Sequence, residues 1–308
     1  MRGIVELQPA VSPVHHFEEP FMFTFAPVAR AAVLVFAGCA GFAALPVSAA
    51  QVVVPQTALT PSGKYYTDII GGGIGDVVVM TGGGHSANVG AADGRNDDGF
   101  SGPISFGYTT PLSFFGVPQT SFFANNNGNI SFGSGISAYV PTGPTGADAP
   151  VISPWFGDVD TQGAASGVLH LRTDVANETI LTWDNVGYFD THDDKLNSFQ
   201  LVVRGPDYAI PAGEGAIGFF YKAMPWEVTD TSTTAAVGFG DGSGNSEVLA
   251  GSNTSGLNGV VANRFIWFDQ NLVPVPPVDA IPEPETYALM LAGLGLLGVV
   301  ARRRRSSR

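Results

Sequence analysis

The chain has 308 residues, of which 40 are glycine, 22 are proline and only 13% are charged. Glycine and proline together stay below the share, about 25–30%, that marks chains without a packed core, and 21 phenylalanines supply apolar area for one. The net charge of -13 argues against nucleic acid as a partner, because binding to a phosphate backbone needs a positive face.

The first fifty residues (1–50) have the order of segments that a secretory signal peptide shows. Arg30 precedes an apolar run at 31–45, and small residues follow that run directly. Because signal peptides combine a basic start, a short apolar run and a small-residue cleavage site in this order, we expect export across the inner membrane. The mature chain is then expected to begin at Ala50 or Gln51.

A glycine-rich extension, residues 51–91, follows this leader. Two Gly-Gly-Gly runs, at 71–73 and 82–84, bracket the apolar residues 77–80, and the turn signals are weak. We expect this segment to pack loosely and to add a strand to the domain that follows it. The glycine runs lack the Lys-Ser/Thr pair and the βαβ context of a phosphate-binding loop, so no nucleotide site is expected.

Residues 92–270 have the pattern of an all-β domain. Short segments rich in Val, Ile, Phe, Thr, Tyr and Trp recur between clusters of Gly, Pro, Asn and Asp, which is typical of an antiparallel β-sandwich. The turn-forming sequence at 126–129 tolerates positive φ and predicts a hairpin between the first two strands. The strands that we expect are 121–124, 129–132, 168–172, 179–189, 198–204, 216–223, 235–239 and 265–268.

Aromatic residues within these strands are expected to form the core. Trp155, Trp183, Phe199 and Phe239 each stand in an apolar strand segment with turn residues nearby. The alternative for the tryptophans is a set of stacking platforms for sugars, which would leave their rings exposed. Core packing is the favoured interpretation, because aromatic side chains contribute most when they are buried.

Two carboxylates, Asp158 and Asp160, imitate the start of a calcium-binding loop. A secreted acidic protein could gain stability by holding Ca2+ with several oxygen ligands. The resemblance to an EF-hand fails at its twelfth position, where Leu169 stands in place of a bidentate Glu. The alternative is that both carboxylates cap strands and turns beside a buried Trp155. Calcium is the only cofactor that the sequence suggests, and both interpretations stay open.

No catalytic residues are expected. The mature region contains His85, His170 and His192 but no Gly-x-Ser-x-Gly motif, and the only cysteine, Cys39, lies in the leader. The acidic run 190–194 is expected to be a solvated hairpin loop, and the group Asp241, Asn245 and Glu247 makes a similarly weak case for a metal site. Carboxylate pairs for glycoside hydrolysis stay open, because the separation they need is spatial.

The C-terminal end combines a spacer, a short apolar run and a basic cluster. The proline-rich linker 271–281 favours an extended conformation. The apolar run at 287–301 would reach about 22 Å as a helix, against a hydrocarbon core of about 30 Å, so it would span the membrane marginally. The basic residues after it should stay cytoplasmic, which leaves the acidic domain outside the inner membrane. These residues are Arg302, Arg303, Arg304 and Arg305.

Residues 282–308 resemble the PEP-CTERM sorting signal of Gram-negative bacteria. The triplet Pro282, Glu283 and Pro284, the short transmembrane helix and the terminal arginines occur in that order. The resemblance implies recognition by an exosortase in the inner membrane, cleavage near the triplet, and transfer to the cell surface or the exopolysaccharide matrix. The membrane anchor would then be transient, and a permanent single-pass anchor is the alternative.

Residues 92–270 resemble the NIDO domain, the extracellular module of nidogen, alpha-tectorin and some mucins. The blocks that carry the resemblance are 97–99, 106–107, 114–116, 126–132 (NNGNISF), 152–161 (ISPWFGDVDT), 167–172, 181–189 (LTWDNVGYF), 197–201 and 236–242. The resemblance implies cell-matrix adhesion or matrix interaction, with no catalytic residues to inherit. The cysteine-rich modules that follow the domain in the animal proteins are missing here.

Together these patterns predict a single all-β, antiparallel sandwich-like domain between a signal peptide and a C-terminal transmembrane helix. The function expected is that of a secreted or surface-associated, non-enzymatic protein of cell-matrix adhesion. The alternative is a carbohydrate-binding module or an enzyme that acts on the exopolysaccharide matrix.

Overall fold

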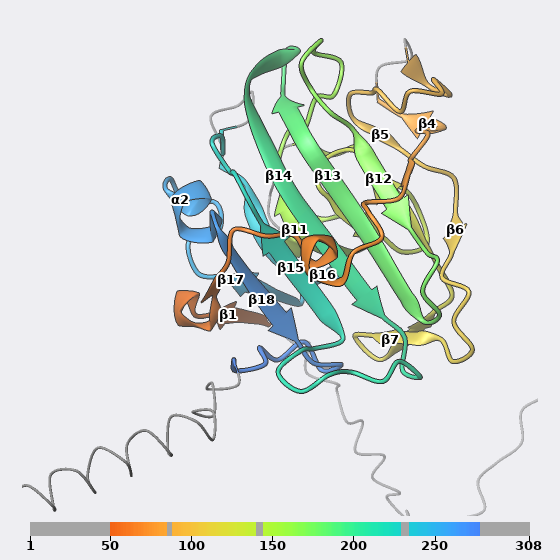
Figure 1. Ribbon diagram of the computed structural model, residues 1–308, viewed down its shortest axis with the longest axis vertical. Helices are drawn as coiled ribbons and strands as arrows, with labels where there is room; N and C mark the ends of the chain where they lie inside the picture. The colour runs from red at the N-terminus through yellow and green to blue at the C-terminus, as the bar shows by residue number, and fades with distance from the viewer. Residues whose placement is uncertain (1–49, 85–87, 140–143, 229–233, 278–308) are drawn as a thin grey trace, which may run out of the picture. The chain divides into compact units, whose positions relative to one another are not determined.

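Strand-forming residues dominate the part of the chain that the structure describes. The computed structural model describes residues 50–84, 88–139, 144–228 and 234–277 (Figure 1). All of them belong to one compact unit, Val47–Arg308, while the other unit, Met1–Pro46, lies outside the described residues. Branched and aromatic side chains pack well on a pleated sheet, and they form strands here as expected. The fold is mostly β, with two large sheets.

The larger sheet has nine strands within the described residues. All pairs are antiparallel except the one at its edge, where β1 runs parallel to β17. In spatial order the strands are β1 (Gln51–Val54), β17 (Ser246–Leu249), β16 (Ala236–Asp241), β11 (Pro150–Phe156), β10 (Asn129–Ser131), β9 (Ser121–Asn125), β5 (Gly99–Phe100) and β4 (Gly82–Gly83), with β6 (Ile104–Ser105) paired to β9.

The second sheet has seven strands within the described residues, all antiparallel. Its centre is the long hairpin of β13 and β14. In spatial order the strands are β2 (Thr60–Pro61), β18 (Arg264–Phe268), β15 (Ile217–Tyr221), β14 (His192–Arg204), β13 (Glu178–Tyr188), β12 (Leu169–Arg172) and β3 (Asp76–Val77). A separate hairpin joins β7 (Leu112–Phe114) to β8 (Val117–Gln119). The helical pieces are short: η1 (Gln56–Ala58), α1 (Tyr66–Ile70), η3 (Pro144–Gly146) and α2 (Leu257–Val261).

The eight predicted strands are all present, as β9, β10, β12, β13, β14, β15, β16 and β18. The predicted hairpin at 126–129 is confirmed, because β9 and β10 pair antiparallel with Asn125 opposite Asn129. Sterically, the turn requires a glycine at position 128. Gly128 has a φ of +75°, and a Cβ added there would lie 1.8 Å from the carbonyl oxygen of Trp155.

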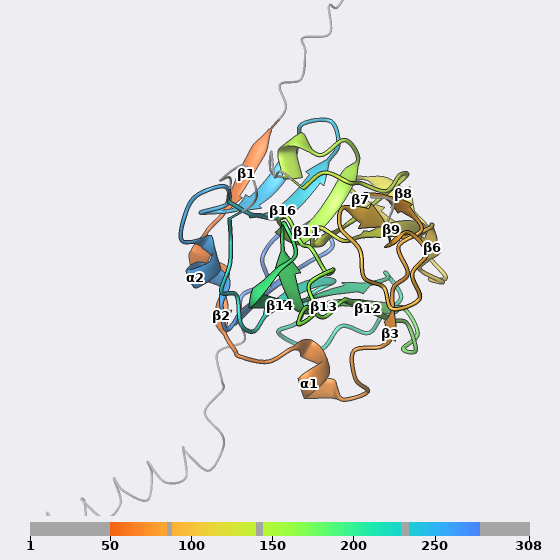
Figure 2. The same ribbon diagram turned by 90° about the horizontal axis from the view of Figure 1, so that it is seen from above.

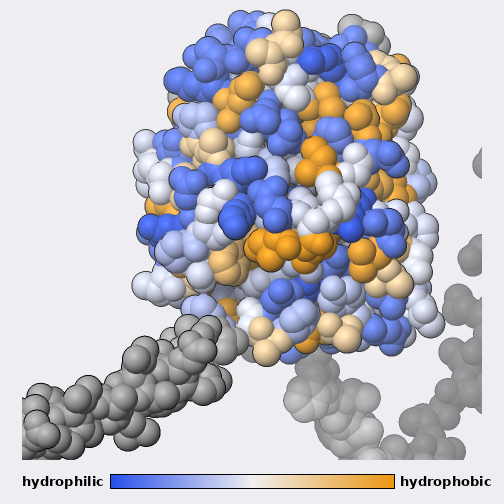
Figure 3. Space-filling model, viewed as in Figure 1, coloured by the Kyte–Doolittle hydropathy of each residue, from blue (hydrophilic) through white to orange (hydrophobic). Residues whose placement is uncertain are grey.

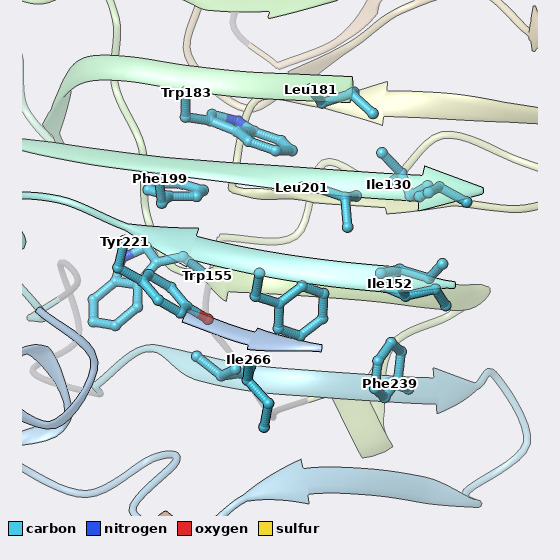
Figure 4. Close-up of a cluster of buried hydrophobic side chains, with 14 of the residues drawn as sticks. Ile130, Ile152, Trp155, Leu181, Trp183, Phe199, Leu201, Tyr221, Phe239 and Ile266 are labelled. Atoms are coloured by element: carbon cyan, nitrogen blue, oxygen red, sulfur yellow. The ribbon is translucent and has the colours of Figure 1, made fainter. Parts of the chain in front are cut away.

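The core between the two sheets is aromatic, as predicted. Trp155, Trp183, Phe199 and Phe239 are all fully buried, and Figure 4 shows them among aliphatic side chains from both sheets. The other two tryptophans, Trp226 and Trp267, are also buried, at 4% and 3% exposure. None of the four tryptophans is therefore available as an exposed platform for sugars.

The outer face of the seven-stranded sheet is covered by the segment that contains α1, which lies outside that sheet in Figure 2. Tyr66 packs on Phe220 and Trp267 there. Polar contacts fix the same segment, since the Thr67 amide donates to Gln200 Oε1 (3.2 Å) and the Arg204 guanidinium donates to the Tyr66 hydroxyl (2.7 Å). The segment 51–91 thus contributes two short strands to each sheet, β1 and β4 to the larger and β2 and β3 to the smaller. The sequence predicted one strand in this segment.

The two ends of the chain lie outside the described residues, and with them the predicted signal peptide and the predicted transmembrane helix. In the part that is described, no helix is long and apolar enough to cross a membrane. The first residues of the predicted linker 271–281 are docked: the Val275 amide donates to the carbonyl oxygen of Trp267 (2.8 Å), and Pro274 forms a bridge with Phe268.

Candidate functional site

Three chain segments that are far apart in the sequence meet beside the β9–β10 turn. Asp97 forms an isolated antiparallel bridge with Asp160. Next to it, the Asn96 amide donates to Thr161 Oγ1 (2.8 Å), and the Thr161 amide donates to the Asn96 carbonyl (3.0 Å). The bridge and these hydrogen bonds place the acidic residues of 97–98 against those of 158–160.

Asn126 and Asn127, in the β9–β10 turn, stabilise this arrangement by hydrogen bonds. Asn127 donates through Nδ2 to Asp98 Oδ1 (2.7 Å) and accepts a hydrogen bond at Oδ1 from the Val159 amide (2.9 Å). Asn126 donates through Nδ2 to the carbonyl oxygens of Asn96 and Val159. Trp183 in turn donates through Nε1 to the Asn126 carbonyl (3.0 Å), which ties the turn to the core.

Three carboxylates come together in this frame. Oxygen atoms of Asp97, Asp98 and Asp158 lie within 4.8 Å of one another, and Asp98 and Asp158 are buried at 8% and 3% exposure. Several carboxylate oxygens at such short separations are the ligand type that a hard divalent cation takes in proteins. Within the described part of the chain, these three residues form the group whose ligand atoms lie close enough together to hold a metal ion.

The two aspartates that the sequence singled out have different surroundings. Asp158 belongs to the carboxylate group with Asp97 and Asp98. Asp160 is buried, and it accepts hydrogen bonds from the Gln162 amide at Oδ1 and from the Thr191 amide at Oδ2, both 2.8 Å. Asp160 thus makes the turn-capping contacts of the alternative interpretation. Calcium binding at Asp158 stays a prediction.

The sequence reasoning did not assign Asp97 and Asp98 to this site. Their one signal was the Asp-Asp-Gly block at 97–99, which served only for the family resemblance. About sixty residues separate them from Asp158 along the chain. Spacing alone could not bring them together, because the contact depends on how β5 and β11 are placed in the sheet.

The other acidic groups lie in or beside turns, except Glu247, which lies in β17. Of the run 190–194, only Asp190 and Thr191 lie in the β13–β14 turn, both with a φ of 58°, and the remaining residues are the first three of β14 rather than the expected loop. The Tyr188 hydroxyl donates to Asp194 Oδ1 (2.8 Å), and this hydrogen bond lowers the pKa of Asp194. Asp241 accepts hydrogen bonds at Oδ1 from the amides of Ser243 and Asn245 (2.7 and 2.9 Å).

The histidines contact backbone carbonyls. His170 Nδ1 lies 3.2 Å from the Gly75 oxygen, and His192 Nδ1 lies 2.7 Å from the Phe189 oxygen. The His192 ring also stacks on Tyr188, with 4.8 Å between centroids. His85 lies outside the described residues, as do the sorting triplet at 282–284 and the arginines at 302–305.

Comparison with known families gives two matches. A family described as NIDO related matches residues 80–266, a span that contains both sheets' central strands and the carboxylate group. A motif described as the PEP-CTERM protein-sorting motif matches residues 280–305. No solved structure matches the chain.

Proposed function

The chain belongs to the NIDO-related family and ends in a PEP-CTERM sorting motif, and from these two findings we propose that it is a non-enzymatic protein of cell-matrix adhesion. The sorting motif implies export, sorting to the cell surface and processing by an exosortase. The proposal adds the adhesive role and the partner, which is the extracellular matrix or its exopolysaccharide. The observation that carries it is the presence of both features in one chain.

The described surface fits binding through polar contacts better than binding through exposed aromatic rings. All four tryptophans are buried, and among the exposed large hydrophobic residues Tyr139 is the one aromatic, at 36% exposure. Figure 3 shows one face, on which hydrophobic residues form small patches among hydrophilic ones. The burial of the tryptophans argues against one form of the alternative, a module that stacks sugars on tryptophan rings.

The short distance between the domain and the sorting motif supports a role for cleavage. Pro277 is the last described residue, and five Cα steps at about 3.8 Å each carry the chain at most about 19 Å to Pro282. The apolar run begins at residue 287, ten Cα steps from Pro277, so an intact anchor would keep the domain within about 38 Å of the membrane. An adhesive contact with the matrix beyond the cell envelope therefore needs cleavage, with the anchor serving only transiently.

The proposal is tested in the native host by deletion of the gene. The deletion strain is complemented with the wild-type gene or with a Glu283→Ala variant, which leaves the apolar run and the arginines unchanged but alters the sorting triplet. We expect the wild-type gene to restore attachment of cells to a surface coated with the host's own exopolysaccharide, and the variant to accumulate in the inner membrane without restoring it. Attachment that is unchanged by the deletion would refute the adhesive role.

A further inference from the structure

Two bulky apolar residues, Phe115 and Leu272, have a left-handed backbone conformation. Nine described residues other than glycine have a positive φ, and six of them are Asn or Asp, which tolerate this region. A seventh, Thr191, lies in the β13–β14 turn. The remaining two are bulky and apolar: Phe115, with a φ of 46°, and Leu272, with a φ of 64°. Side chains of this kind adopt the left-handed region only at an energetic cost, and such residues cluster at ligand-binding sites.

Phe115 and Leu272 are far apart in the sequence, yet both line the same pocket of about 300 Å³. One wall is the tip of the β7–β8 hairpin, and the opposite wall is the turn at 269–273 that follows β18. Glu247, from β17, completes the lining between them. The two bulky apolar residues with a positive φ in the described chain therefore meet at one site, each in a tight turn: Phe115 precedes Gly116 (φ 76°) at the tip of the hairpin, and the Leu272 amide donates to the Asp269 carbonyl (3.1 Å).

The strained conformation of each wall is fixed by packing and hydrogen bonds. Phe115 contacts Phe114 edge-to-face with 4.9 Å between centroids, and Phe114 is buried against Phe132 in the core. Leu272 is buried at 5% exposure, and Asp269 Oδ1 accepts hydrogen bonds from the amides of Asn271 (2.8 Å) and Val273 (2.9 Å). Both walls are thus held in place before any ligand arrives.

The polar groups of the pocket are suited to hydroxyl groups. The side chains of Ser113, Gln270 and Asn271 are exposed and make no hydrogen bond with the described part of the chain, so a hydroxyl and two carboxamides are available as donors and acceptors. Glu247 is half-buried, and its burial together with the charge of Asp269 raises the pKa of the Glu247 carboxyl to about 6. This carboxyl can therefore exchange between accepting and donating a hydrogen bond at a pH of about 6.

Other classes of ligand fit less well. An anion would be repelled by Glu247 and Asp269. A metal ion would find a single carboxylate in the lining, that of Glu247, because Asp269 Oδ1 already accepts two amides. A large apolar ligand would not satisfy the three polar side chains. A neutral polyhydroxylated ring remains, with the ring of Phe115 offering an apolar surface and a volume at the small end of known ligand sites.

We infer that the pocket between the β7–β8 hairpin and the turn at 269–273 binds one neutral hexose unit of a polysaccharide. The inference rests on the proposed function, because it supplies the contact through which an adhesion protein would hold exopolysaccharide. The hydroxyl groups of the sugar would form hydrogen bonds with Gln270, Asn271 and Glu247. Phe115 would pack against the carbon-hydrogen face of the ring.

The test uses the processed protein released by the host. Isothermal titration with glucose, galactose, mannose and N-acetylglucosamine, and with glucuronic acid as an anionic comparator, should show saturable binding of at least one neutral sugar and none of the acid. The variants Gln270→Ala and Glu247→Ala should weaken that binding at least tenfold. The matched control is Asp148→Asn, which removes an exposed carboxylate that does not line the pocket and should bind as the wild type does.

A second measurement, the retention of each variant by the host's exopolysaccharide, separates the possible failures. Sugar binding that is undiminished in both pocket variants, or binding of glucuronic acid alone, overturns the pocket. Absence of sugar binding together with normal retention by exopolysaccharide also overturns the pocket but leaves the adhesive role intact. If the host's exopolysaccharide does not retain even the wild-type protein, both the sugar-binding pocket and the adhesive role are overturned. Circular dichroism of each variant confirms that it is folded before it is compared.

Discussion

Trp183 and Phe199 are directly opposite each other on β13 and β14, and their rings stack with 5.0 Å between centroids and 14° between planes (Figure 4). Both are fully buried, and the indole of Trp183 also donates a hydrogen bond to the carbonyl of Asn126 in the β9–β10 turn. One side chain therefore links the hairpin of the seven-stranded sheet to the turn that holds the carboxylate group.

The first prediction concerns this pair. Trp183→Ala should lower the free energy of unfolding by about 3–5 kcal/mol, because it removes a large buried ring and leaves a cavity. Trp183→Phe is the matched control, since it keeps an aromatic ring and loses the indole hydrogen bond with only part of the ring volume, and it should cost less. Urea denaturation measures both. An unchanged midpoint for Trp183→Ala would contradict the core described above.

The second prediction concerns a buried ion pair. Arg204 and Glu178 are 3.0 Å apart with side-chain exposures of 0% and 1%. Glu178→Gln should cost about 3 kcal/mol, because a buried arginine that loses a counter-charge is strongly destabilising. Asp174→Asn is the control: Asp174 pairs with Arg172 but is 63% exposed, so its substitution should lower the free energy of unfolding far less than Glu178→Gln does. Equal effects in chemical denaturation would be incompatible with the burial of Arg204.

The third prediction concerns pH. The pKa of Glu247 is raised from 4.5 to about 6 in the folded protein, so the folded state binds this proton more tightly than the unfolded state. Its contribution to stability is therefore fully present below about pH 4.5 and is lost as the pH rises through 6. Glu247→Gln should flatten this part of the stability profile, whereas Asp148→Asn should leave it in place. A wild-type profile without a Glu247-dependent decline over this range would contradict the assignment.

The fourth prediction concerns calcium, which the sequence assigned to Asp158 and Asp160 and which the structure relates to Asp158 with Asp97 and Asp98. If the carboxylate group of Asp97, Asp98 and Asp158 binds Ca2+, the ion stabilises the folded state by RT ln(1 + [L]/Kd), about 2.7 kcal/mol at one hundred times Kd. The thermal midpoint should rise from chelator to millimolar Ca2+, and Asp158→Asn should abolish the rise while Asp148→Asn preserves it. Identical melts of the wild type in both buffers would favour the structural interpretation of these aspartates.

The sequence predicted the elements whose signals are local. The β9–β10 hairpin followed from its Asn-Asn-Gly-Asn turn, and the β13–β14 hairpin from its apolar residues and acidic tip. The strand β11 was not predicted, because it contains Pro150 and Pro154 and proline weakens a strand prediction. Pro150 is the first residue of β11 and pairs with Asp241, and Pro154 lies within a register shift between Ser153 and Phe156.

The features that sequence reasoning missed depend on contacts between distant segments. The parallel pairing of β1 with β17 joins residues nearly two hundred positions apart, and nothing in the local pattern of either strand specifies it. The helix α1 is five residues long, which is too short for a helical period to be visible. The carboxylate group and the pocket at Phe115 and Leu272 arise in the same way, from the placement of loops by the two sheets.

The central claim, that the processed protein joins cells to their matrix, is tested most directly by a bridging measurement. Cells that lack the gene are mixed with the host's purified exopolysaccharide and increasing amounts of the released wild-type protein, and the polysaccharide that sediments with the cells is quantified. We predict that this amount rises with the protein and saturates, with no new reducing ends in the polysaccharide. Polysaccharide that stays in the supernatant at every protein concentration, or that is shortened by the protein, would contradict a non-enzymatic adhesive function.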